Sequence, residues 1–184
     1  GATACAASLL KLTPEQTVNA LGLTGSQAGG VAEYLTNSSS SKCFHAGWAA
    51  QSGIIAASLA KGGMTGPDTI FEGRYSLYQT HGIKEQAQPE QVALGLGDVW
   101  EFLNVSIKPY PVCHFAHATV DCGRNLLKKG IAADDIDSVE CVVDPVAAAL
   151  ICEPPETKWA PQTAYGAKFS LPWLFAAVFL DNAL

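Results

Sequence analysis

The sequence around Lys42 combines two side chains that suit chemistry. Lys42 and His45 are three residues apart in a segment that we expect to open a helix, so they share one face of its first turn. The amino-terminal end of a helix carries partial positive charge, and a lysine there is unfavourable unless an anion binds nearby. Such a local conflict is typical of functional sites. The alternative is that Lys42 is a solvated surface lysine and His45 a hydrogen-bonded core histidine.

A second lysine, Lys108, lies in the stretch IKPYPVCHFAH, residues 107–117. Pro109 and Pro111 exclude a helix interior and a central strand, which predicts a stiff, extended connector. Lys108 stands between two apolar residues of this connector, so we expect its aliphatic stem to be partly buried. It has the same two interpretations as Lys42, a functional cation or a solvated one.

His114 and His117 share a face if a helix begins by residue 115. Two such histidines can ligate a metal, but no further ligand is suitably spaced, so we expect no metal there. The cysteines form no C-x-x-C pair and no zinc-ligand spacing, and we expect buried thiols in a reducing cytoplasm. They are Cys5, Cys43, Cys113, Cys122, Cys141 and Cys152. No G-x-S-x-G, P-loop or G-x-G-x-x-G motif is present.

The elements that must position these residues are mostly helical. Thr13, Pro14 and Gln16 form a capping-box signal, and a face of small residues predicts a helix with close neighbours over 42–61. Further helices are expected over 2–12, 115–129 and 169–180, a strand over 138–143 and a loop over 153–165. The prediction is mainly α with an α+β part: an all-helical segment over 1–105, then the start of a smaller α+β domain over 106–184.

Composition excludes several classes of protein. Hydrophobic residues make up 48% of the chain and charged residues 15%, which argues against disorder. The net charge of −6 argues against a general nucleic-acid binder. No run approaches the ~18 consecutive apolar residues of a membrane span, so we expect no membrane insertion.

Several motifs together resemble the MmgE/PrpD family. They are SKCFHAGWAAQSGIIAASLAKGGMTGPDTIFEG, which holds Lys42, His45 and Gly47, and IKPYPVCHFAHATVDC, which holds Lys108, His117 and Asp121. AKFSLPW at 167–173 is similar to a later family segment. The resemblance implies a large helical domain with a smaller α+β lid, a homodimer, and a cleft for small di- or tricarboxylates. It also implies chemistry that needs no metal or organic cofactor.

The resemblance also implies roles for particular residues. Lys42 and Lys108 would be the catalytic cations, stabilising charge that develops on a substrate carboxylate when the neighbouring carbon loses a proton. His45, His117 and Trp173 would contact the substrate, and a histidine would move the proton. Trp173 stands where related sequences often carry tyrosine, so an indole N–H replaces a phenol.

Among the family's reactions, the resemblance favours a dehydratase acting on 2-methylcitrate. Iminodisuccinate epimerase and cis-aconitate decarboxylase are the alternatives within the family. Family members are considerably longer, so we expect this chain alone to expose an apolar patch on its helical half. They also carry acidic and histidine catalytic residues upstream of Gly1, so we expect this chain alone to lack turnover. A different alternative is a non-catalytic structural piece that needs a partner chain.

Overall fold

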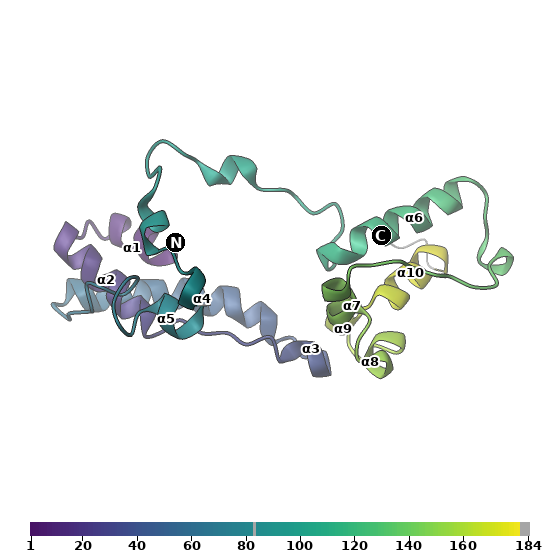
Figure 1. Cartoon of the computed structure of the whole chain (residues 1–184), viewed down its shortest axis with the longest axis horizontal. Helices are drawn as coiled ribbons and strands as arrows, with labels where there is room; N and C mark the ends of the chain where they lie inside the picture. The colour runs from purple at the N-terminus through teal and green to yellow at the C-terminus, as the bar shows by residue number, and fades with distance from the viewer. Residues whose placement is uncertain (83, 181–184) are drawn as a thin grey trace. The chain divides into compact units, whose positions relative to one another are not determined.

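A computed structural model describes residues 1–82 and 84–180 of the chain and divides it into two compact units (Figure 1). The first unit comprises Gly1–Gly30 and Cys43–Val105, and the second comprises Val31–Lys42 and Ser106–Leu184. The sequence predicts an all-helical segment over 1–105 followed by an α+β segment over 106–184. It does not anticipate that Val31–Lys42 packs with the second unit.

Helices of small residues build the first unit. Its α-helices are α1 (Ala2–Leu9), α2 (Pro14–Gly25), most of α4 (Ser41–Lys61) and α5 (Leu77–His81), with short 3-10 helices at Lys84–Gln86, Pro89–Ala93 and Glu101–Asn104. Ala6, Ala20, Ala57 and Ala60 form its buried cluster. A Cβ on Gly53 would lie 2.7 Å from the Cβ of Ala2, so α1 approaches α4 as closely as the small-residue face predicts.

The capping box at the start of α2 is confirmed. The Thr13 hydroxyl accepts a hydrogen bond from the Gln16 backbone N–H at 3.2 Å, and the Gln16 side chain accepts one from the Thr13 N–H at 3.0 Å. Pro14 occupies the first helical position, where a missing N–H has no cost.

The second unit is also helical. Its elements are α3 (Tyr34–Asn37), a 3-10 helix (His114–Ala116), α6 (His117–Lys128), a 3-10 helix (Ala133–Asp135), α7 (Pro145–Ile151), α8 (Pro155–Trp159), α9 (Ala164–Ala167) and α10 (Leu171–Leu180). Helices α6 and α10 lie side by side (Figure 1). Val120, Ile151 and Val178 belong to the buried core between them. Gly123 permits the close approach, because a Cβ there would lie 3.3 Å from Val178 Cγ1.

The mainly α part of the prediction is confirmed, but the predicted strand over 138–143 is wrong. The structure assigns no strand anywhere in residues 1–82 and 84–180. The segment keeps its alternation, since Cys141 and Val143 pack against the core while Val142 is 93% exposed. A strand requires a second segment that forms hydrogen bonds with its backbone N–H and C=O groups, and no described segment pairs with this one. The loop expected over 153–165 is also wrong, because α8 and the beginning of α9 occupy part of it.

Two expectations about the surface have different outcomes. Cys5, Cys43 and Cys122 are exposed, so the expectation of six buried thiols is wrong for half of them. In the first unit, the large apolar side chains from Leu94 to Val105 are each more than half exposed, in line with the expected apolar surface of the helical half. Over the described residues, no helix is long and apolar enough to cross a membrane.

Candidate functional site

The second unit contains a cavity of about 240 Å³ that gathers three lysines. Lys42 and Lys108, the two catalytic cations that the family resemblance implies, line it together with Lys168. The other lining residues are Pro111, Val112, Cys113, Tyr165 and Phe169. Among the residues that the structure describes, this lining has three ammonium groups and no carboxylate, so the cavity suits an anion. We call it the lysine cavity.

Lys42 reaches the lysine cavity because its segment packs on α9. The Thr163 hydroxyl donates a hydrogen bond of 3.0 Å to the Ser38 carbonyl oxygen. Gly166 faces Ser38 so closely that a Cβ added to it would lie 2.6 Å from the Ser38 Cβ. The Lys42 ammonium then lies 4.7 Å from the centre of the Phe169 ring, within the range of a cation–π contact.

Hydrogen bonds to backbone groups of the connector position the side chain of Lys108 and the main chain of Lys168. The Lys108 ammonium donates a hydrogen bond of 3.0 Å to the Val112 carbonyl oxygen, which bends its side chain back over the proline-containing turn. The Cys113 N–H donates to the Lys168 carbonyl oxygen at 2.9 Å and so joins the connector to the segment after α9. Lys168 places its ammonium 5.9 Å from the Tyr165 ring centre. The connector forms neither helix nor strand from 105 to 113, as its prolines predict.

His117 lies in the same unit, outside the lining of the lysine cavity. Its ring stacks on His114 with ring centres 4.9 Å apart, and it meets the edge of Tyr110 at 5.4 Å. Only 8% of His117 is exposed, and its Nε2 finds no hydrogen-bond partner in the described part of the chain. The Tyr110 hydroxyl donates to Asp121, and this hydrogen bond to a carboxylate is the main cause that raises the pKa of Tyr110. Tyr110 therefore stays protonated and is not a candidate base.

The other two predicted substrate contacts are His45 and Trp173. His45 is a half-buried residue of α4 in the first unit, where its ring packs near Gly30. Trp173 is 45% exposed in the first turn of α10, and its backbone N–H donates to the Ser170 hydroxyl at 3.1 Å. Trp173 is not in the lining of the lysine cavity. The structure thus brings the two predicted lysines together, and His117 and Trp173 of the same unit are not among the described residues that line their cavity.

A fourth lysine is buried behind this site. Lys158 is 2% exposed and donates a hydrogen bond of 3.0 Å to the Leu150 carbonyl oxygen at the end of α7. Burial lowers the pKa of Lys158, because the charged form loses hydration. No ion pair compensates this burial in the described structure, so the buried amine destabilises the fold when it is protonated.

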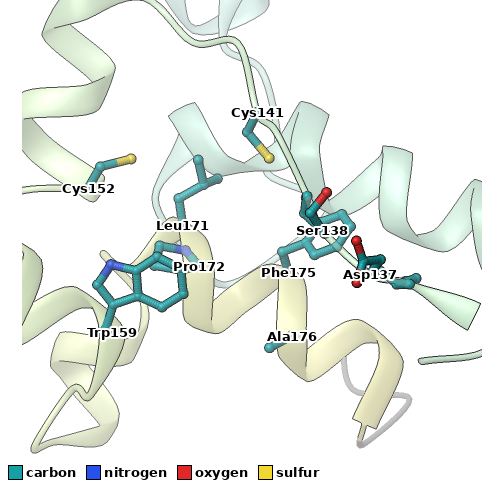
Figure 2. Close-up of a pocket in the computed structure, with 11 residues that line it drawn as sticks. Asp137, Ser138, Cys141, Cys152, Trp159, Leu171, Pro172, Phe175 and Ala176 are labelled. Carbon is teal, nitrogen blue, oxygen red and sulfur yellow. The ribbon is translucent and has the colours of Figure 1, made fainter. Parts of the chain in front are cut away.

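A larger cavity of about 600 Å³ lies between the extended segment 136–141 and α10 (Figure 2). Cys141, Cys152, Trp159 and Phe175 are among the mostly apolar residues around it. Within residues 1–82 and 84–180, Asp137 is the only charged residue of its lining. Large apolar cavities are often ligand sites, but this one has no cation to bind a carboxylate. The smaller lysine cavity is therefore the better candidate for an acidic substrate.

Sequence reasoning missed Lys168 and Tyr165. The signal was present, since Lys168 is the one charged residue of the quoted segment AKFSLPW. Its importance depends on a hydrogen bond to Cys113, which is 55 positions away, and spacing along the chain cannot show that contact. In the described residues, no three His, Cys, Asp or Glu side chains are arranged to hold a metal ion.

Comparison with known proteins matches almost the whole chain to one family. The MmgE/PrpD N-terminal domain matches residues 1–90, and the MmgE/PrpD C-terminal domain matches residues 110–184. The chain is 26% identical over 188 residues to the cis-aconitate decarboxylase-like protein oryM of Aspergillus oryzae, covering 96% of this chain and 38% of that protein. It is 30% identical over 123 residues to a cis-aconitate decarboxylase of Aspergillus terreus, covering 64% of this chain and 25% of that protein. The chain thus spans less than two-fifths of the length of these relatives.

Proposed function

Because the chain belongs to the MmgE/PrpD family, we propose that it carries the carboxylate-binding lysines of a lyase or isomerase that acts on a small di- or tricarboxylate. The observation that supports this most strongly is the lysine cavity, with three ammonium groups and no carboxylate in its described lining. Its volume of about 240 Å³ lies below the ~300–1,000 Å³ of pockets for drug-sized ligands, which suits a small acid.

The proposed chemistry uses the lysines to stabilise negative charge. In decarboxylation, a carbon–carbon bond breaks and carbon dioxide leaves. The electron pair stays on the remaining carbon skeleton, which then takes up a proton. In dehydration, a base removes a proton next to a carboxylate and hydroxide leaves from the adjacent carbon. In both reactions charge spreads onto a carboxylate, and ammonium groups fixed beside it lower the barrier.

Lys42 and Lys108 are the proposed catalytic cations. Lys42 is held over the Phe169 ring, and Lys108 is held by the Val112 carbonyl oxygen, so neither ammonium has to be ordered when the substrate binds. His45 and His117 remain proposed substrate contacts and proton carriers. Within the described lining, Cys113 and Tyr165 also carry exchangeable protons.

The first reaction to test is decarboxylation of cis-aconitate, because the two relatives named above carry that activity in their names. Identity of 26–30% does not transfer a substrate, so dehydration of 2-methylcitrate, which the sequence resemblance favours, stays the second candidate. Epimerisation of iminodisuccinate is the third. We further propose a homodimer in the cytoplasm, and light scattering of the purified protein tests the dimer.

A substrate panel tests the proposed function. The 184-residue chain and any longer protein that contains it are assayed for carbon dioxide release from cis-aconitate, water loss from 2-methylcitrate and epimerisation of iminodisuccinate. We expect a longer protein that contains the chain to convert at least one acid, and the 184-residue chain alone to convert none. In the longer protein, Lys108→Ala should decrease turnover about 10²-fold or more, since removing one stabilising group typically costs ~10²–10³-fold. Lys128→Ala, at an exposed lysine in the last turn of α6, is the matched control. No turnover of any of the three acids by the longer protein, or equal turnover in its two variants, contradicts the proposal.

A further inference from the structure

The third cation of the lysine cavity has no role in the function proposed above. That proposal uses Lys42 and Lys108, yet Lys168 lines the same cavity. Lys168 follows α9 directly, and its backbone carbonyl oxygen accepts the hydrogen bond from Cys113. The main chain at Lys168 is therefore fixed against the connector that carries Lys108, while its side chain remains exposed enough to meet a ligand.

Nothing in the described lining neutralises Lys168. The described lining contains no Asp or Glu, and the Lys168 ammonium lies 5.9 Å from the centre of the Tyr165 ring. Three positive charges around a cavity of about 240 Å³ repel one another. A ligand with three negative charges relieves this repulsion more completely than a ligand with two. A lysine that lines a cavity together with two other lysines, and whose ammonium lies 5.9 Å from an aromatic ring centre, is thus better explained by a third carboxylate than by a structural role.

We propose that Lys168 binds a third substrate carboxylate and that it makes the lysine cavity select tricarboxylates over dicarboxylates. The inference rests on the proposed function for the identity of the site, and it adds a residue that determines specificity. Lys42 and Lys108 bind carboxylates that both classes of acid possess, whereas Lys168 contacts a carboxylate that only the tricarboxylate supplies.

Two unreactive acids that differ by one carboxylate provide the test. Propane-1,2,3-tricarboxylate carries a central carboxylate, and glutarate is the same chain without it. Isothermal titration calorimetry measures the Kd of each acid for the wild-type protein and for Lys168→Gln, at low salt and again at about 0.15 M, where exposed charges are screened beyond ~8 Å. We expect the wild type to bind the tricarboxylate about tenfold more tightly than glutarate at low salt, and less selectively at higher salt.

Lys168→Gln should abolish this selectivity. The Kd of the tricarboxylate should increase about tenfold, while the Kd of glutarate changes less than about twofold. Lys168→Arg should retain the preference because it retains the charge. Lys129→Gln, which removes an exposed charge after α6, should leave both constants unchanged. Circular dichroism shows whether each variant remains folded.

The outcomes separate this inference from the proposed function. If Lys168→Gln increases the Kd of both acids by the same factor, Lys168 contributes only to the general positive charge of the cavity, and the inference is wrong. It is also wrong if neither Kd changes, or if neither acid binds to the wild type. If the selectivity depends on Lys168 but none of the three candidate substrates is converted, the inference stands and the proposed function fails. If a substrate is converted at the same rate in Lys168→Gln and in the wild type, the function stands and the inference fails.

Discussion

Replacing Gly166 by alanine should move Lys42 away from the lysine cavity without changing any of the three lysines that line it. A Cβ at position 166 would lie 2.6 Å from both the Cβ and the Oγ of Ser38, whereas ordinary contacts begin at 3.4 Å. The segment Val31–Lys42 must therefore move by about 0.8 Å or more. Overpacking of this kind typically costs ~1–3 kcal/mol of unfolding free energy. The backbone of Gly166 itself permits alanine, since its φ is not positive.

The displacement should also weaken ligand binding. Lys42 lies at the end of the segment that Gly166→Ala moves, and its ammonium is held only 4.7 Å from the Phe169 ring centre. If Lys42 no longer faces the cavity, the loss of one charge-assisted contact weakens binding of propane-1,2,3-tricarboxylate by about tenfold. Calorimetry measures this change, and urea unfolding measures the change in stability. Gly47→Ala is the matched control, because a Cβ at position 47 meets no atom within 4 Å.

A second substitution should restore the site. Ser38→Gly removes the two atoms that the new Cβ would approach most closely and leaves only the milder contact with Thr163 Oγ1 at 3.2 Å. Ser38 has a φ of 57°, which glycine adopts readily. The double variant should therefore recover both stability and affinity. Wild-type affinity in Gly166→Ala alone would refute the proposed link between this packing and Lys42. Failure of Ser38→Gly to restore affinity would refute the steric explanation.

Two further predictions concern buried titratable groups. Burial lowers the pKa of Lys158, so between that lowered value and the usual ~10.4 the unfolded state binds more protons, and stability rises with pH. Urea unfolding at several pH values should show the wild type gaining stability relative to Lys158→Met as pH rises towards ~10.4, and a constant difference would contradict this. Burial also raises the pKa of Cys141 and Cys152, so iodoacetamide at pH 7 should alkylate both more slowly than exposed Cys5, as peptide mass spectrometry can measure. Equal rates would show that the two thiols are accessible and ionised.

Local signals in the sequence predicted helices well because each depends on neighbouring residues. The Thr13–Gln16 capping box, for example, acts within one turn of the chain. The strand over 138–143 depends instead on a distant partner segment. Its alternating pattern was real, as Cys141 and Val143 show, but a pattern of burial does not supply the backbone partner that a strand needs.

The candidate site was predictable only in part for the same reason. Lys42 and Lys108 stand in recognisable motifs, and the structure places both in one cavity. That cavity forms because Ser38 meets Gly166 and because Cys113 bonds to the carbonyl of Lys168. These contacts join residues far apart in the sequence, so Lys168 could not be assigned from spacing. The motif containing His117 was recognisable too, but packing directs that ring towards Tyr110 and His114.

The central claim is that Lys42, Lys108 and Lys168 form one binding site for substrate carboxylates. Lysine acetylation, quantified by mass spectrometry with and without saturating propane-1,2,3-tricarboxylate, tests it most directly. All three lysines line the cavity, so a bound ligand should slow their acetylation together. Acetylation of exposed Lys128 should be unchanged. Protection of all three lysines with none at Lys128 is the predicted result. Unchanged acetylation of the three, or equal slowing at Lys128, would contradict the account.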